Sequence, residues 1–157
     1  MDLFTVYDSP LGRLYLTAGE NGLTGLGFTM PGGCIRQDDD PGFHPAIHWL
    51  DLYFRGEDPP VDFPICPRGT AFQLAVWAIL ARIPRGETRT YGEIAKALSP
   101  NMAPQAVGQA VGANPISILI PCHRVVGTGG RLTGYAWGLD RKTWLLRHEG
   151  ILKEDPL

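Results

Sequence analysis

The sequence lacks both a long hydrophobic run and a dense set of cysteines. No stretch of its 157 residues approaches the ~18 consecutive apolar residues of a membrane span, and no basic and apolar secretion signal opens it. Only three cysteines occur, Cys34, Cys66 and Cys122, and they are far apart. An odd, scattered set argues against a disulfide framework and favours a reducing compartment. We therefore expect a protein of the cytoplasm or nucleoid, with no membrane partner.

The tight Cys-x-x-Cys pairs of common zinc sites are also missing. A metal site could still be assembled from Cys34 and Cys66 together with His44 and His48, which are four residues apart. This zinc site is the weaker alternative, because nothing else in the sequence supports it. The favoured prediction is a protein without a metal or another cofactor.

The net charge is low, at −2, but it is unevenly divided along the chain. Residues 1–65 carry three arginines against ten acidic residues, or −7, whereas residues 66–157 carry eleven basic against six acidic residues, or +5. A basic half beside an acidic half is typical of a nucleic-acid-binding domain with a companion that does not bind. Ordinary charge scatter is the alternative. We place the boundary between the two domains at residues 65 and 66.

The N-terminal domain is predicted to be a small antiparallel sheet with one helix. With 44% hydrophobic residues, the chain can bury a core. Residues 4–7, 13–18 and 23–29 are rich in β-forming residues and are separated by turn residues, which predicts three strands. Residues 30–42 are rich in Gly, Pro and Asp and predict a solvated loop. The apolar spacing of residues 44–55 predicts a helix that packs on the sheet.

The C-terminal domain is predicted to be helical and to contain a helix-turn-helix. Thr70 with Gln73 and Thr90 with Glu93 match the capping box, which marks the start of a helix. Helices are expected at residues 72–83, 91–98, 105–112 and 141–148, the last one capped by Asp140. The second and third of these helices, joined by a tight turn, form a motif that either binds DNA or is merely structural.

Residues 114–126 bring a thiol and an imidazole together. Residues 116–120 are largely β-branched and apolar, which predicts a short buried strand that Pro121 ends. Cys122 is then expected at the end of this strand, next to His123. A cysteine attacks as the thiolate, and a neighbouring histidine lowers its pKa, so the pair suggests a nucleophile. A buried, inert cysteine is the alternative for a bare Cys-His pair.

The longer phrase around this pair favours the nucleophile. Pro-Cys-His-Arg-Val at residues 121–125, preceded by Asn-Pro at 114–115 and an aliphatic segment, resembles the active-site signature of the O6-alkylguanine-DNA alkyltransferases, or methylated-DNA–protein-cysteine methyltransferases. The resemblance is strong over residues 69–150 and looser before them. It implies an α/β (α+β) fold, with a ribonuclease H-like N-terminal domain and a helical C-terminal domain that carries a winged-helix-like helix-turn-helix.

The resemblance also implies a reaction and the residues that perform it. Members of this family flip a nucleotide carrying O6-alkylguanine out of duplex DNA and transfer the alkyl group to their own cysteine, once per molecule. Here Cys122 matches the acceptor, His123 the base that takes the thiol proton through a water, and Glu149 the carboxylate that orients this base. Asn114 matches the residue that braces the active-site turn. Tyr91 matches the tyrosine that donates to guanine N3.

Two further groups of residues match family positions. The pocket for the alkylguanine is expected to contain Val125, Tyr135, Ala136, Trp137 and Lys142. Contacts to DNA are expected from Thr90, Gln105, Ala106, Gly108 and Arg124. The implied partner is double-stranded DNA carrying O6-alkylguanine, bound by a monomer or by a cooperative assembly.

The sequence departs from the family pattern at two of these positions. Gln105 stands where the family has an arginine that fills the gap left by the flipped base. Weaker DNA affinity and a shallower salt dependence are therefore expected. Trp137 stands where the family often has glycine in the lid over the pocket. Its indole is expected to narrow the pocket and to favour methyl over benzyl-sized adducts.

Three other classes of function remain as alternatives. A non-catalytic, alkyltransferase-like damage sensor would lack the acceptor cysteine, which is present here as Cys122. A plain helix-turn-helix regulator has no use for the Pro-Cys-His-Arg-Val phrase. A cysteine hydrolase needs a site for acyl transfer that nothing in the sequence indicates. The sequence therefore favours a single-turnover DNA-repair transferase.

Overall fold

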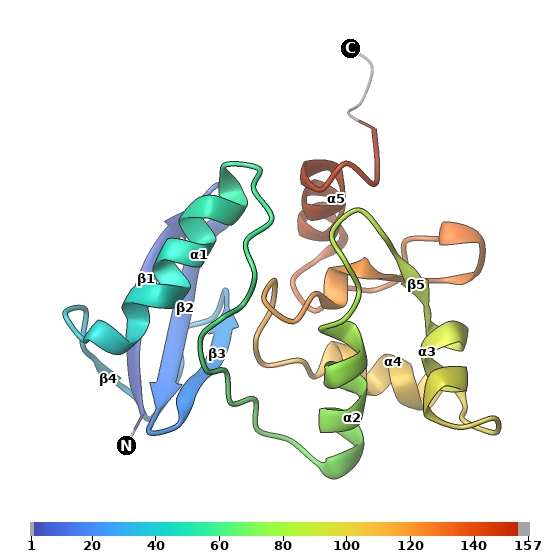
Figure 1. The fold of residues 1–157 in the computed structure, drawn as a ribbon, viewed down its shortest axis with the longest axis horizontal. Coiled ribbons are helices and arrows are strands. Elements are labelled where there is room, and N and C mark those ends of the chain that lie inside the picture. The colour runs from blue at the N-terminus through green and yellow to red at the C-terminus, as the bar shows by residue number, and fades with distance from the viewer. Residues whose placement is uncertain (1, 154–157) are drawn as a thin grey trace. The chain divides into compact units, whose positions relative to one another are not determined.

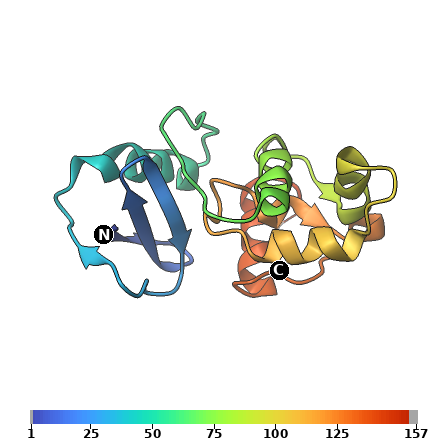
Figure 2. The ribbon, with the colours of Figure 1, turned by 90° about the horizontal axis from the view of Figure 1, so that it is seen from below.

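The computed structural model describes residues 2–153, and the chain forms two compact units. The first, here called the sheet unit, consists of the residues up to Arg68 together with Pro115–Ser117. The second, here called the helical unit, consists of Gly69–Asn114 and the chain from Ile118 onward. Figures 1 and 2 show the ribbon of both units. No helix within residues 2–153 is long and apolar enough to cross a membrane.

In the described part of the sheet unit, four strands form a sheet in the order β3-β2-β1-β4 (Figure 1). β1 (Leu3–Ser9), β2 (Gly12–Gly19) and β3 (Gly22–Gly27) are consecutive antiparallel strands, which confirms the three predicted strands. Gly12 and Gly22 begin β2 and β3 with φ angles of 118° and 137°, which side chains other than glycine rarely tolerate. These two turns therefore depend on glycine.

Helix α1 (His44–Phe54) confirms the helix expected at residues 44–55 and covers one face of the sheet (Figures 1 and 2). Its buried residues recur three and four positions apart, as a single apolar face requires: Ala46, Trp49, Leu50 and Tyr53. Leu14 and Leu16 of β2 are fully buried as well. The alternating buried residues of β2 and the helically spaced buried residues of α1 thus form the two sides of one core.

The segment 30–42, expected to be a solvated loop, contains regular structure, so that prediction is wrong. β4 (Ile35–Arg36) pairs in parallel with β1, and the 3-10 helix η1 (Pro41–Phe43) begins at the cap residue Asp40, whose carboxylate accepts a bond from Gly42 N. Both residues of β4 are exposed. A strand with no buried face has no apolar alternation in its sequence by which it could be recognised.

Up to residue 153, the helical unit contains four α-helices: α2 (Ala71–Leu80), α3 (Tyr91–Leu98), α4 (Pro104–Gly112) and α5 (Leu139–His148). Both predicted capping boxes form. Thr70 Oγ1 accepts a bond from Gln73 N while Gln73 Oε1 accepts one from Thr70 N, and Thr90 and Glu93 repeat the arrangement. Helices α3 and α4 pack against each other and against α2. The helix-turn-helix expected from the sequence is therefore present.

Helix α5 begins earlier than expected, and Asp140 does not cap it. The N-cap is Gly138, with a φ angle of 96° and no side-chain bond, and Asp140 lies inside the first turn. A carboxylate in the first turn still interacts favourably with the positive end of the helix dipole. Asp140 therefore indicates correctly that a helix begins nearby, but it is not the N-cap residue.

A small parallel sheet lies beside the helix-turn-helix. β5 (Arg89–Thr90) leads directly into α3 and pairs with β6 (Val125–Val126), and the 3-10 helix η3 (Thr128–Gly130) follows β6. This pairing is consistent with the winged-helix-like arrangement that the resemblance implied. It also connects the start of α3 to the segment that follows Cys122.

The strand expected at residues 116–120 is absent. Only Ile116 pairs with β3, where Leu26 N bonds to Pro115 O and Ser117 N bonds to Leu26 O. The chain then turns at Ile118, whose φ is 72°. The β-branched run was apolar because its side chains are buried, not because it is extended.

Candidate active site

Cys122 is almost completely buried and begins the 3-10 helix η2 (Cys122–Arg124), instead of ending a strand. Its backbone N donates to Ile120 O at 2.8 Å, and the Asn114 side chain donates to the same oxygen at 2.8 Å. Asn114 follows the C-cap of α4, so one end of this helix is tied to the residues before the cysteine. The geometry agrees with the bracing role that the resemblance implied for Asn114.

A buried network of three charged or polar side chains follows the cysteine. His123 Nε2 lies 2.7 Å from Glu149 Oε2, and neither side chain is exposed. Arg124 donates from Nε to Glu149 Oε1 at 2.7 Å and from Nη2 to Oε2 at 3.0 Å. Its Nη1 donates to Ile83 O at 2.6 Å. Glu149 is thus held between an imidazole and a guanidinium in a fixed orientation.

The second ring nitrogen of His123 is the one available for chemistry. Within the described part of the chain, Nδ1 is buried and has no hydrogen-bond partner. When Nε2 donates its proton to Glu149, Nδ1 carries the lone pair of the neutral ring. The imidazole is therefore set to accept a proton at Nδ1.

The ionisation of these groups is governed by burial. Burial raises the pKa of Cys122, with Asn114 and Lys142 opposing it, so the resting thiol is protonated. Burial lowers the pKa of His123, although Glu149 pulls it upward, which keeps the ring neutral. Burial raises the pKa of Glu149, but bonds from His123 and Arg124 outweigh it and leave the pKa below its usual value. The site at rest is therefore a thiol, a neutral base and a carboxylate.

Lys142 of α5 holds the segment after Cys122 to the following loop. Its Nζ donates to Val125 O at 2.6 Å, Thr133 O at 2.9 Å and Gly134 O at 3.3 Å. Only 1% of this residue is exposed, and burial lowers its pKa to about 8. An ammonium group with three carbonyl acceptors fixes two chain segments at once. Lys142 therefore shapes the site through the backbone, beyond the pocket-lining position predicted for it.

Several predicted DNA and substrate residues lie together at the start of the helix-turn-helix. A cavity of about 370 Å³ is lined by Thr90, Tyr91, Gly92, Pro104, Gln105, Gly108, Gly127 and Thr128. The Tyr91 hydroxyl accepts a long bond of 3.4 Å from Thr133 Oγ1. Gln105 is exposed and Ala106 is half-buried. The first turns of α3 and α4 thus share one recess, and its walls come from residues that are far apart in the sequence.

Two predicted contacts do not fit the structure. Arg124 was expected to bind DNA, but it is 8% exposed and its guanidinium is engaged by Glu149 and Ile83 O. Val125 is completely buried, and it contributes only its carbonyl, which accepts a bond from Lys142. Burial explains both corrections, because neither side chain has surface to offer.

The loop between η3 and α5 carries the remaining predicted pocket residues. Tyr135 and Trp137 are half-buried, and Ala136 is exposed. Tyr135 lies near the Cys122 sulfur, where it slightly opposes the burial that raises the pKa of this thiol. Trp137 O accepts a bond of 3.3 Å from Arg141 Nη1. The structure therefore places Tyr135 near the cysteine, and the pocket-lining roles of Ala136 and Trp137 stay predictions.

Sequence reasoning missed two supports of the site. It did not foresee the ion pair of Arg124 with Glu149, nor the bond of 3.1 Å from Arg85 Nη2 to His148 O. A charged residue directly after Cys-His, within an otherwise apolar segment, was a signal of a buried partner. The second bond had no signal in the sequence.

Two family models match the chain. The 6-O-methylguanine DNA methyltransferase ribonuclease-like domain matches residues 3–67, and the DNA binding domain of the same family matches residues 71–151. A methylated-DNA–protein-cysteine methyltransferase of Methanosarcina acetivorans is 45% identical over 152 residues, which cover 94% of this chain and 97% of that relative. A relative of the same name from Mycobacterium tuberculosis is 45% identical over 150 residues, or 93% and 91% of the two chains.

Solved structures agree with these matches. The crystal structure of Mycobacterium tuberculosis OGT in complex with DNA has a TM-score of 0.86 and 44% sequence identity, and the match covers 94% of this chain and 92% of that one. Similarity over nearly the full length of both chains includes both units.

Proposed function

Because the chain belongs to the 6-O-methylguanine DNA methyltransferase family, we propose that it repairs DNA by transferring an alkyl group from O6 of guanine to its own Cys122. The observation that carries this proposal is a buried group of three side chains, Cys122, His123 and Glu149. In this group, His123 Nε2 lies 2.7 Å from Glu149 Oε2. Burying a carboxylate is costly unless it is paired, so an inert cysteine would not need this arrangement beside it.

The reaction is a single displacement at the alkyl carbon. The sulfur of Cys122 forms the S–C bond while the C–O6 bond breaks, and the electron pair of that bond stays on O6 of guanine. The thiol proton passes to Nδ1 of His123, through a water, because the thiol is protonated at rest. The purine anion then takes up a proton at N1, and the imidazolium of His123 gives up the thiol proton through the same water, so both groups end neutral. The thioether is stable, so each molecule acts once.

Other residues position the nucleotide. Tyr91 donates to guanine N3 and helps the leaving purine to carry negative charge, while Tyr135, Ala136, Trp137 and Lys142 shape the pocket. The flipped base is reached from the recess that Thr90, Gln105 and Gly108 line. Ala106 lies beside them on α4 and completes the DNA contact. For Arg124, the burial and the bonds to Glu149 support a positioning role instead.

We also propose a division of labour between two domains, residues 1–65 and 66–157. The second binds DNA and accepts the alkyl group, and its net charge of +5 suits a phosphate backbone. The first, at −7, serves as a companion. The partner is double-stranded DNA carrying O6-alkylguanine, and the protein acts as a monomer in the cytoplasm or nucleoid.

The loss of the lesion from DNA tests this function. A duplex with one O6-methylguanine is incubated in excess over the protein, and the remaining lesion is counted after nuclease digestion. We expect one lesion to be lost per protein molecule and none with Cys122→Ser. If the lesion persists although the duplex is bound, the protein is a damage sensor. Loss of many lesions per molecule would instead indicate a turnover enzyme.

A further inference from the structure

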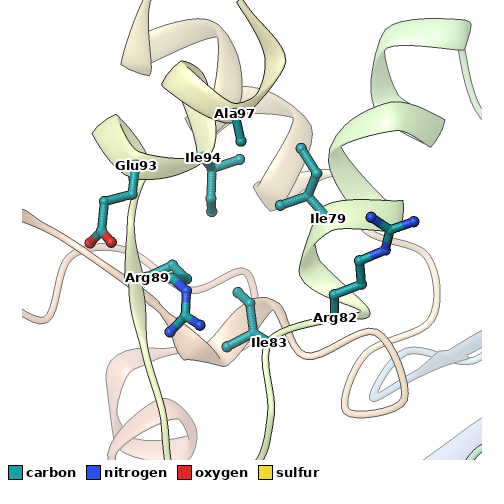
Figure 3. Close-up of a pocket in the computed structure, with 7 residues that line it drawn as sticks. All are labelled: Ile79, Arg82, Ile83, Arg89, Glu93, Ile94 and Ala97. Carbon is teal, nitrogen blue, oxygen red and sulfur yellow. The ribbon is translucent and has the colours of Figure 1, made fainter.

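A second cavity, of about 390 Å³, lies between α2 and α3 (Figure 3). It is lined by Ile79, Arg82, Ile83, Arg89, Glu93, Ile94 and Ala97. None of these side chains has a role in the proposed alkyl transfer, although the backbone carbonyl of Ile83 accepts a bond from Arg124. The volume lies within the range of roughly 300–1,000 Å³ that is common for small-ligand pockets.

The interior of this cavity is apolar and held in place. In Figure 3, Ile79 and Ile83 face Ile94 and Ala97 across the opening. Ile83 and Ile94 are 3% and 1% exposed, so they form the floor. The carbonyl of Ile83 accepts the 2.6 Å bond from Arg124, which fixes this wall from behind. A cavity with fixed walls loses little conformational entropy when a ligand binds.

The rim carries one guanidinium that is free to bind a ligand. Within the described part of the chain, the exposed side chain of Arg82 has no hydrogen-bond or ion-pair partner. Arg89 is already paired with Glu87 at 3.1 Å. The carboxylate of Glu93 accepts a bond from Thr90 N and points away from the centre of the cavity in Figure 3. One unpaired positive charge therefore stands beside four apolar side chains.

We propose that this cavity binds a monocarboxylate whose neighbouring group is branched and apolar. The planar fork of Arg82 matches the two oxygens of a carboxylate, and the isoleucines receive the apolar group. A phosphate dianion fits less well, because it needs a second unpaired cation. The same chemistry occurs in a free N-acyl amino acid and at the C-terminal residue of a peptide. The site is independent of the alkyl transfer.

A pair of probes that differ only in charge tests the site. N-acetyl-L-leucine and N-acetyl-L-leucinamide are titrated into the full chain, and the methyl signals of Ile79, Ile83 and Ile94 are followed by NMR. We expect saturable shifts of these signals, and about tenfold weaker binding of the neutral amide, which corresponds to ~1.4 kcal/mol. A pentapeptide that ends in leucine should bind more tightly than N-acetyl-L-leucine if the natural ligand is a peptide terminus, and equally if it is a small acid.

Three variants locate the binding. Arg82→Ala should abolish the preference for the acid over the amide, and Ala97→Phe should prevent binding by filling the opening. Lys96→Ala removes an exposed cation of helix α3 that lies outside the cavity. It should change neither the affinity for N-acetyl-L-leucine nor the preference for the acid over the amide. The proposal is overturned if the isoleucine signals do not saturate with N-acetyl-L-leucine, or if acid and amide bind equally to the unmodified chain.

Discussion

In the proposed reaction, Glu149 is the residue on which the chemistry depends most. Its two oxygens receive three hydrogen bonds, one shared with His123 and two from Arg124. The carboxylate orients the ring so that Nδ1 is the free nitrogen, and its charge partly offsets the burial that lowers the pKa of His123. Removing the charge should therefore alter the pH dependence of the reaction, and not only its rate.

Replacing this carboxylate by an amide tests that role. His123 must be neutral to accept the thiol proton, so the rate falls as the pH drops through its pKa. In Glu149→Gln the attraction that raises this pKa is lost, and the charge of Arg124 is no longer balanced. We expect the acid limb of the single-turnover rate to move to lower pH and the plateau to fall by about 10²-fold. Glu87→Gln, on the surface, is the control and should match the unmodified chain. An acid limb that stays in place would contradict the role.

Ile118 has an unusual backbone conformation. Its φ of 72° is the only positive φ of a non-glycine residue within residues 2–153, and its side chain is 1% exposed. A β-branched residue in the left-handed region costs free energy, on the order of 1–2 kcal/mol. This strained turn precedes Cys122 by four residues and begins the part of the helical unit that follows Pro115–Ser117.

The strain can be measured by comparing two small residues at this position. Glycine is normally less stable than alanine, by roughly 0.5–1 kcal/mol. At a positive φ the order should reverse, so we expect Ile118→Gly to be about 1 kcal/mol more stable than Ile118→Ala in urea unfolding. The same two substitutions at the buried Ile120 serve as the control and should keep the normal order. If both positions show the same order, Ile118 is not strained.

Among the elements, α4 is proposed to set the strength of DNA binding through its first turn. Gln105 is exposed there and lines the 370 Å³ recess with Tyr91. Gln105→Arg should tighten binding to a duplex with the lesion and steepen the dependence of log Kd on log salt by about 0.9, the contribution of one more phosphate contact. Gln109→Arg adds the same charge on α4 outside this recess. Equal affinity and slope for Gln105→Arg and the unmodified chain would exclude the proposed role.

The loop before α5 is expected to limit the size of the adduct. Trp137 is half-buried in this loop, next to Gly138 with its φ of 96°. Trp137→Gly should therefore accelerate transfer from O6-benzylguanine, by about tenfold or more, while transfer from O6-methylguanine changes little. Single-turnover rates on the two duplexes check this, and the methylated duplex is the internal control. No gain for the benzyl adduct would show that the indole does not narrow the pocket.

The elements that the sequence predicted are those with their own local pattern. The strands β1 to β3, the helix α1 and the two capping boxes carry signals within a few residues. The misplaced segment, residues 116–120, is apolar throughout, and an apolar run does not distinguish an extended chain from one that turns in a core. The pairing of β5 with β6 places Arg89 opposite Val125, which lies 36 residues later in the sequence. No local pattern can reveal such a pairing.

The candidate site divides in the same way. Cys122 and His123 were recognisable because they are adjacent, and Asn114 and Glu149 because a longer resemblance named them. The second partner of Glu149 could not be recognised in this way, because the resemblance assigns Arg124 to a DNA contact. A sequence gives the charge of a residue but not its burial, and here burial decides the role.

In the whole molecule, charge and structure divide the chain at similar places. The sheet unit holds most of the acidic residues, and the helical unit holds Cys122, its network and both recesses. The three-residue return of the chain at Pro115–Ser117 completes the sheet unit immediately before the strained Ile118. In the sheet unit, Leu26 bonds to Pro115 and Ser117, and in the helical unit Glu149 bonds to His123.

The mass of the intact protein after reaction with methylated DNA tests the central claim most directly. The chain is incubated with a duplex carrying O6-methylguanine, and its intact mass is measured before it is digested for peptide mapping by mass spectrometry. The other free cysteines, Cys34 and Cys66, are internal controls. We predict a stoichiometric gain of one methyl group, ~14 Da, on the peptide that contains Cys122, and no gain in Cys122→Ala. A methyl group on another cysteine, or no gain despite binding to the lesion, would contradict the assignment of Cys122 as the acceptor.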